Sequence, residues 1–266
     1  MGTGVYKAYK KDKTEYYRAY MHYKGKHISL GNYETEGEAT VAYIEAKNLT
    51  TSDETVLDAL NDLEALSFEK AVSILNFKNT GIYFGAPIYL EKNYFRYYLS
   101  ADYPLLFDRE DLFYYSEHKI LSRGGYLFVN DYGSQINILS RYGIRNHSVK
   151  GVDYIFKNGN ERDLRYANVE VINPWNGVKK ESRNGITVYQ VRIHLNGYFQ
   201  VGIYKDEITA AIAYNKACDM AKASGIETEF TQNYVLNHIS AKEYASIYSN
   251  LRVLKKLERY LESCSC

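Results

Sequence analysis

Basic, aromatic and amide side chains recur at every second position in two stretches of the chain. These positions are Arg18, Tyr20 and His22 near the N-terminus, and Gln190, Arg192 and His194 in the second half. Residues two apart in an extended strand point to the same side, so each stretch places these groups on one face. Arg, Gln and His can hydrogen-bond to base edges, and Tyr can donate to a phosphate oxygen. The pattern indicates nucleic-acid binding through a sheet face.

The candidate contacts extend onto the neighbouring strands. The first outward set is Tyr6, Arg18, Tyr20, His22, His27 and Ser29, and the second is Lys179, Gln190, Arg192, His194, Tyr198 and Gln200. The residues that alternate with them are apolar and are expected to face a core: Val5, Ala19, Met21 and Leu30 in one set, and Val178, Val191, Ile193 and Val201 in the other.

Both stretches belong to a duplicated segment. Residues 17–46 align with residues 189–217 across a single one-residue gap, and His22, Gly25, Gly31 and Tyr33 match His194, Gly197, Gly202 and Tyr204. In each copy a period of two gives way to alanines at helical spacing. Each copy therefore predicts a module of three strands packed on one helix, and small alanines let the helix lie close to the sheet.

Charge is segregated within each predicted module. Residues 1–33 carry seven Lys or Arg against two acids, whereas residues 34–50, the predicted helix, carry four Glu against one Lys. In the second copy, residues 174–204 carry four basic residues against one Glu. A basic sheet with an acidic helix behind it suits a sheet that faces phosphates.

The module resembles the ethylene-response-factor (APETALA-type) DNA-binding domain. The resemblance rests on Gly-Val before the first strand, on Leu30-Gly31-Asn32-Tyr33 and Val201-Gly202-Ile203-Tyr204, and on a helix with the pattern Ala-x-x-Ala-Tyr. It implies that the three-stranded sheet enters the major groove of duplex DNA. Arg18 and Arg192 keep a cation on the second strand, but other residue types replace the family's usual neighbours, so the base sequence read is not implied.

The central region resembles the phage-type HNH homing endonucleases. The matching features are Asp108-Arg109-Glu110-Asp111, the Gly125-Tyr126 strand, a predicted helix at 135–142 and a motif ending in Gly159-Asn160, Asp163, Arg165 and Asn168. Members of that family often carry an ethylene-response-factor-type module after the nuclease, as this chain does.

The nuclease chemistry needs a His as general base and a metal ligand beside it. The resemblance puts Phe156 at the general-base position and Ile155 at the ligand position, and neither can do this work. Asp163, Arg165 and Asn168 survive, but they also serve to tie the loop to a following helix. We therefore expect no catalysis, no metal and no other cofactor, with Arg141 and Arg145 able to grip phosphate. The alternative is an active nuclease that takes its groups from elsewhere, such as His147 with Asp153 and Asp163.

Composition limits the remaining choices. The 266 residues contain 33 Lys and Arg against 32 Asp and Glu, so a net charge of +1 gives no whole-molecule attraction to DNA. Three cysteines fit a reducing compartment, and no apolar stretch approaches the length of a membrane span. We expect a cytoplasmic, nucleoid-associated protein with no membrane partner. An amphipathic helix at 241–262 is expected to cover the second module or to form a homodimer contact.

The sequence thus predicts an α+β chain in which two DNA-binding modules flank a degenerate HNH domain of the ββα-metal type. The expected domains are a first module (1–50), a helical connector (51–97), the degenerate HNH-like domain (98–173), a second module (174–234), and a C-terminal helix and tail (235–266). The expected function is sequence-specific binding of double-stranded DNA by a transcriptional regulator derived from a homing endonuclease. The alternatives are an active metal-dependent endonuclease and a DNA-binding accessory factor of a mobile element.

Overall fold

The fold is α+β, as the sequence predicts. The computed structural model describes residues 4–53, 56–61 and 63–264, and combines helices with small antiparallel sheets of two or three strands. The chain divides into two compact units, Met1–Ser148 with Ile155–Glu170 and Val149–Tyr154 with Val171–Cys266. No helix within the described ranges is both long enough and apolar enough to cross a membrane.

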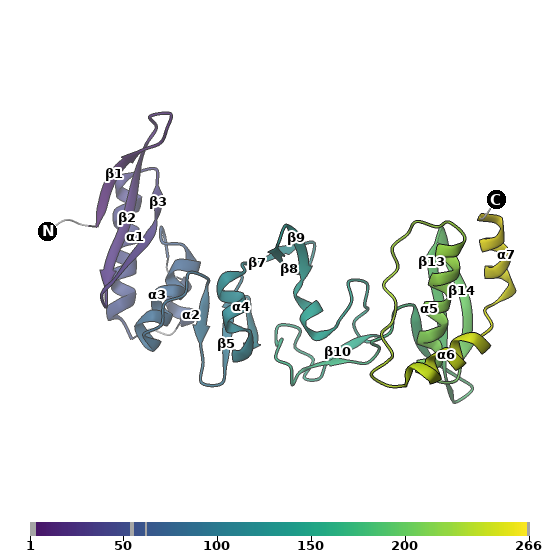
Figure 1. Cartoon of the computed structure of the whole chain (residues 1–266). Coiled ribbons are helices and arrows are strands. Elements are labelled where there is room, and N and C mark those ends of the chain that lie inside the picture. Colours follow the sequence, from purple (N-terminus) through teal and green to yellow (C-terminus); the bar gives the residue numbers. More distant parts are fainter. Residues whose placement is uncertain (1–3, 54–55, 62, 265–266) are drawn as a thin grey trace. The chain divides into compact units, whose positions relative to one another are not determined.

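The N-terminal segment forms a three-stranded sheet with one helix along a face (Figure 1). Its elements are β1 (Val5–Tyr9), β2 (Glu15–Tyr23), β3 (Lys26–Tyr33) and α1 (Glu36–Thr51). Ala39, Ala42 and Ala46 of α1 are completely buried against the inward side chains of the sheet. Thr35 caps α1 in a capping box with Glu38, which fixes where the helix begins. The predicted stripe of small residues is therefore the packing surface of the helix.

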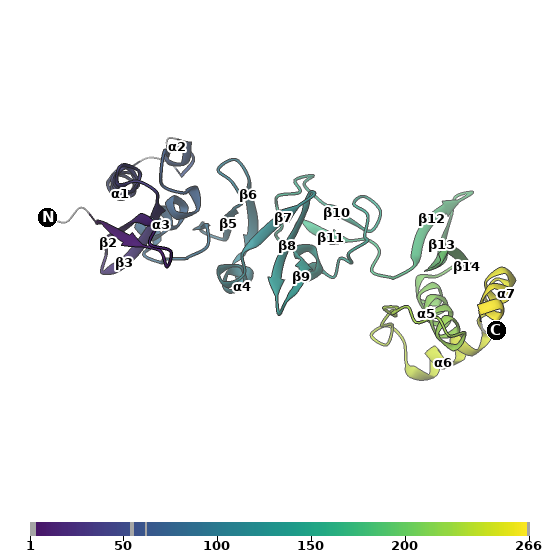
Figure 2. The ribbon, with the colours of Figure 1, turned by 90° about the horizontal axis from the view of Figure 1, so that it is seen from above.

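The second copy repeats this arrangement. It consists of β12 (Val178–Arg183), β13 (Ile186–Leu195), β14 (Gly197–Tyr204) and α5 (Glu207–Ala223). Ala210, Ala213 and Ala217 are buried against Val191, Ile193 and Val201. Figure 2 shows α5 lying against one face of this sheet, which leaves the other face to the polar residues.

Backbone details are shared by the two modules. Val5 pairs with Ala19 as Val178 pairs with Val191, and just beyond these pairs the third strand of each sheet has a bulge, which leaves Leu30 and Val201 without a partner in the register. Gly4 and Gly177 both have positive φ, and a Cβ on either would collide with the ring of Tyr43 or Tyr214 respectively. The duplication therefore preserves a close contact between the backbone before the first strand and a helix tyrosine.

The predicted connector is helical only in its first part. α2 (Val56–Asn61) and α3 (Phe68–Thr80) are followed by strands β4 (Ile88–Leu90), β5 (Tyr94–Tyr98) and β6 (Pro104–Asp108). Phe95 and Tyr97 alternate into a separate core, so strand formation begins before residue 98. The Glu45 carboxylate of α1 accepts the backbone N–H groups of Glu64, Ala65 and Leu66, and this ties the connector to the first module.

A predicted helix at 135–142 is wrong in its first half. After α4 (Leu112–Glu117), the strands β7 (Ile120–Arg123), β8 (Tyr126–Asp131) and β9 (Ser134–Asn137) form a meander, visible in Figure 2. Tyr132 and Gly133 both have positive φ and make a two-residue hairpin turn, which pairs Ile136 with Val129. Only Ile138–Tyr142 is helical, as a 3₁₀ turn.

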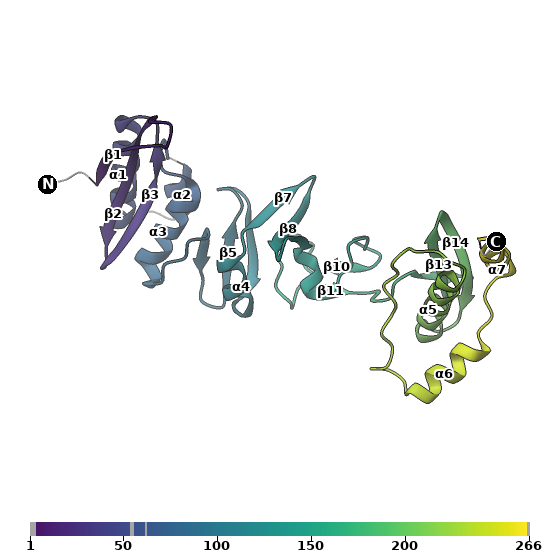
Figure 3. The ribbon, with the colours of Figure 1, turned by 45° about the horizontal axis from the view of Figure 1, so that its top comes forward.

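The predicted C-terminal helix is two helices, α6 (Ala241–Asn250) and α7 (Lys255–Cys264), separated in Figure 3. Between them Val253 is buried, and the backbone N–H of Leu254 donates to the carbonyl of Val201 at 2.9 Å. This pairing with the edge of β14 outweighs continuation of the helix. Leu257 and Leu261 of α7 are buried in the core of the second module, so the helix covers that module, and a homodimer through it stays a prediction.

The cysteines fall in different settings. Cys218 of α5 is a free, buried thiol, and burial raises its pKa to about 12. Cys264 is free and exposed, and Cys266 lies outside the described residues. Cys218 thus belongs to the packing of α5 against its sheet.

Candidate nucleic-acid interface

The outer face of the first sheet carries a cluster of exposed rings. Tyr20 lies at its centre, with ring centroids 5.4 Å from Tyr6, 5.8 Å from His22 and 4.7 Å from His27. The two imidazoles are 4.8 Å apart. All of these residues except the half-buried Tyr20 are exposed. The cluster combines π faces with hydrogen-bonding edges on a surface that α1 does not cover.

Arg18 lies beside this cluster and is held by tyrosines. Its Nε and an Nη donate to the Tyr16 hydroxyl at 3.0 and 2.6 Å. Hydrogen bonding to Tyr6 and then to Tyr16 raises the pKa of Arg18. These contacts restrict the side chain while it stays exposed, so less rotamer entropy is lost when it contacts a ligand. Tyr16 did not enter the predicted set, although it lies two residues before Arg18 on the same strand.

The outer face of the second sheet has a different chemistry. Arg192 and His194 are exposed, and Tyr198 is 77% exposed with its ring centroid 4.9 Å from that of His194. Lys179 is exposed but pairs with Glu181 at 3.2 Å. These predicted residues therefore share one face, as the alternation requires.

Gln190 is a correction to the predicted contacts. It is only 5% exposed, and its Nε2 donates to Gln200 Oε1 at 3.4 Å while its own Oε1 has no hydrogen-bond partner within the described ranges. The sequence pattern gives the right face for Gln190, but packing on that face covers it. In this arrangement its amide contacts Gln200, and little of the side chain is exposed.

The two arginines do not occupy equivalent positions. Arg18 pairs with Asn32 before the bulge of its sheet, whereas Arg192 pairs with Gln200 after the bulge. Arg18 therefore corresponds to Gln190, and Arg192 corresponds to Tyr20. The alignment of the copies already places the two arginines two residues apart. The strand register shows that they therefore lie at different places on the two sheet faces. The two faces present their cations at different places.

Arg141 is a second correction. Its guanidinium pairs with the completely buried carboxylate of Asp111 and stacks 4.4 Å from the Tyr114 ring centroid. A buried carboxylate left without its cation is costly, so the structural role occupies this side chain. Arg145 is half-buried, and its backbone N–H donates to the Ser148 hydroxyl at 3.2 Å.

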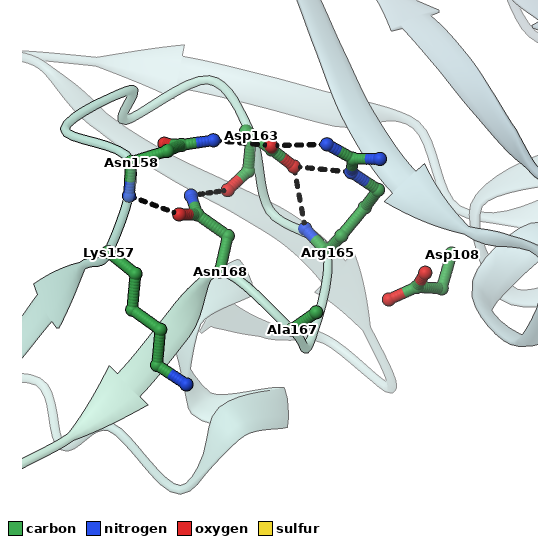
Figure 4. Close-up of a pocket in the computed structure, with 7 residues that line it drawn as sticks. All are labelled: Asp108, Lys157, Asn158, Asp163, Arg165, Ala167 and Asn168. Carbon is green, nitrogen blue, oxygen red and sulfur yellow. Dashed lines mark hydrogen bonds and ion pairs between the residues drawn. The ribbon is translucent and has the colours of Figure 1, made fainter.

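The motif that resembles the nuclease signature forms a tightly bonded loop (Figure 4). Arg165 donates to both oxygens of Asp163, at 2.7 and 2.6 Å, and Asn158 donates to the same carboxylate at 2.8 Å. Asn168 accepts from the Asn158 backbone and donates to the Asp163 carbonyl. Burial alone would raise the pKa of Asp163, but the hydrogen bonds outweigh it and hold that pKa below its ordinary value.

These residues line a hollow of about 390 Å³. Its wall also includes Asp108, which accepts the Tyr166 backbone N–H at 2.7 Å, and Lys157, which pairs with Glu170 at 3.5 Å. Each charged group around the hollow thus has a partner in the surrounding structure: Asp163 and Arg165 bind each other, Asp108 accepts a backbone N–H, and Lys157 pairs with Glu170. Its chemistry is that of a loop held together by its own side chains.

The ββα arrangement expected here lacks its helix. β10 (Tyr154–Phe156) and β11 (Val169–Val171) form a two-stranded sheet, but residues 172–177 lead into β12 without helical structure. The loop bonds therefore stabilise the loop itself and do not tie it to a following helix. Phe156 is half-buried against the core of this region, where an apolar ring packs and cannot take a proton.

Both carboxylates of the alternative catalytic set have hydrogen-bond partners of their own. Asp163 is bound by Arg165, and Asp153 accepts from the Val149 backbone and the Asn173 amide at 2.8 and 2.7 Å. Within the part of the chain that the structure describes, no three His, Cys, Asp or Glu side chains gather into a group that could hold a metal ion. His147 is exposed.

Comparison with known proteins identifies no relative. No family model, no curated protein and no solved structure matches this chain.

Proposed function

We propose that this protein binds double-stranded DNA through the outer faces of its two three-stranded sheets. The carrying observation is that one scaffold occurs twice, each time with alanines packed behind the sheet and exposed Arg, His and Tyr on the opposite face. Packing accounts for the buried side of the module, but it does not require a cationic and aromatic outer side in both copies. Sheet faces of this kind can enter the major groove, where Arg and His reach base edges.

The proposed activity is binding without cleavage. Phe156 packs against a core, and the Asp163 carboxylate is taken up by Arg165 and Asn158, so the loop offers neither a general base nor an open ligand set. Two linked modules raise each other's effective concentration and lengthen the site, which gives selectivity from individually weak contacts. We therefore assign the protein a regulatory role on DNA, descended from a homing endonuclease with its DNA-binding parts retained.

The test incubates the purified full chain with fragmented genomic DNA, with and without Mg²⁺ or Mn²⁺, and sequences both the retained fragments and their ends. Enrichment of one long motif with intact ends is the expected outcome. The double variant Arg18→Ala/Arg192→Ala is tested beside the unaltered protein. It should lose that enrichment, because both cations are exposed on the proposed faces.

Two outcomes contradict the proposal. Retention of fragments that share no common motif would contradict sequence-specific binding. New ends that appear at the motif only with metal would show an active nuclease and overturn the assignment of Phe156. Enrichment near promoters, with altered transcription when the gene is deleted, is the further result that a regulatory role requires.

A further inference from the structure

A hollow of about 530 Å³ lies beside β14, where the sheet face meets the C-terminal segment. It is lined by Arg192, Asn196, Tyr198 and Gln200 of the sheet and its turn, and by Leu254 and Lys256 from the end of the chain. Three of the sheet residues belong to the proposed DNA-binding face. The hollow therefore continues that face beyond the three strands.

The lining is cationic and rich in hydrogen-bond donors. Arg192 and Lys256 are both exposed, and none of the described residues that line the hollow is acidic. The Gln200 carbonyl oxygen accepts from Gln190, which leaves the Gln200 amide NH₂ as a donor. Two cations with amide donors between them match the charge and the acceptor oxygens of a phosphodiester.

Lys256 is brought there by the folding of the C-terminal segment. Leu254 bonds to the edge of β14 through Val201, and the Tyr204 hydroxyl donates to the Arg252 carbonyl at 3.4 Å. On the other side of Lys256, Leu257 is completely buried, and Figure 3 shows α7 beside β14. The segment is therefore fixed on both sides of this lysine, while the lysine itself stays in solvent.

We propose that the hollow beside β14 binds a backbone phosphate of duplex DNA, held between Arg192 and Lys256. The C-terminal segment is then part of the DNA interface as well as a cover for the core of the second module. This inference rests on the proposed function, because it takes the neighbouring sheet face to lie in the groove. Contacts to the backbone fix the register of a reader on the duplex, and Lys256 supplies such a contact at the edge of the sheet.

The test compares Lys256→Gln with Lys255→Gln in the full chain. Lys255 is the adjacent exposed lysine and does not line the hollow, so it is a matched control for loss of one charge. Affinity for the selected duplex is measured across a range of salt concentrations. Loss of one phosphate contact lowers the slope of log affinity against log salt by about 0.9. The ratio of the unaltered protein's affinity to that of Lys256→Gln should therefore fall about threefold when the salt concentration rises fourfold.

The possible outcomes distinguish failure of the phosphate site from failure of DNA binding through the sheet faces. Failure of the unaltered protein to bind any duplex in a sequence-dependent way overturns the proposed function. If the unaltered protein binds, and Lys256→Gln keeps its slope or matches Lys255→Gln, the phosphate site is wrong while sheet-face binding stands. Lys256→Arg should keep the slope of the unaltered protein, since it retains the charge. Equal loss on matched and mismatched duplexes is expected of a phosphate contact, and loss confined to one base position would overturn it.

Discussion

The two modules share a buried side and differ on the exposed side. The alanine stripe, the bulge and the closely packed glycine occur in both, at equivalent places. On the outer face, Tyr6, Tyr20 and His27 of the first module correspond by register to Lys179, Arg192 and Tyr198 of the second. Close packing limits change on one side of a sheet, and solvent tolerates it on the other.

A second difference concerns the edge of the sheet. In the second module the C-terminal segment bonds to β14 and brings Lys256 to the face, whereas in the first module Arg18 is steadied by Tyr16 from the same strand. If both faces contact DNA, the modules contact it through different groups. The duplication therefore supplies one scaffold with two different outer faces.

Replacement of the packed glycines should have the largest effect on stability. A different response in the two modules would contradict the view that they share the same buried packing. Gly4→Ala and Gly177→Ala each place a methyl group against a Tyr ring and a backbone carbonyl, at positive φ. In each variant, the left-handed backbone of a non-glycine residue and the steric overlap of the new methyl group together should lower the unfolding free energy by about 2 to 5 kcal/mol. Gly25→Ala is the control, because its φ is also positive but nothing lies within 4 Å. Denaturant unfolding measures all three, and a control as damaging as the others would contradict the packing argument.

Removal of the two arginines should distinguish the recognition surfaces. Arg18→Ala and Arg192→Ala are each expected to weaken specific binding by about 1 to 3 kcal/mol if they read bases. Because the arginines are not equivalent in register, each variant should relax specificity in a different part of the site. Selection of bound sequences from a random pool measures this. Unchanged affinity in both variants would contradict binding through the sheet faces.

Gln190 should matter little to DNA, although its counterpart in the first module is Arg18. The variant Gln190→Leu removes a buried oxygen that lacks a hydrogen-bond partner, so stability should change by no more than about 1 kcal/mol. Specificity should be retained, because the side chain is buried. Thermal unfolding and the same selection check both points, and a lost base preference would show that Gln190 is a direct reader.

The smallest effect is expected at the exposed ion pairs of β12. Glu181 pairs with Lys179 and Arg183 at 3.2 and 2.9 Å, and hydrogen bonds first from Arg183 and then from Lys179 lower its pKa. Glu181→Gln should leave stability almost unchanged, since exposed pairs contribute little. It should strengthen DNA binding at low salt by releasing two cations. Weaker binding would indicate that Glu181 positions these cations.

The strands and the helix of each module could be predicted from the sequence because the residue patterns that indicate them are local. Alternation of Ala19 and Met21 with Arg18, Tyr20 and His22 gives the face of each residue, and alanine spacing gives the helix stripe. The helix expected at 135–142 was wrong at residues 135–137 because the turn at Tyr132 and Gly133 pairs these residues with β8. The strands at 88–98 were missed because β4 has only three residues and β5 only five, which is too short for a clear alternation.

The sequence by itself determined that one module occurs twice, and which side of each sheet is polar, because both follow from residue order and a period of two. Tertiary structure alone decided which polar residues are accessible. Gln190 is covered, Arg141 is taken by the buried Asp111, and Lys256 is carried to a face formed by residues more than fifty positions earlier. Accessibility depends on what packs across from a residue, and that partner can lie anywhere along the chain.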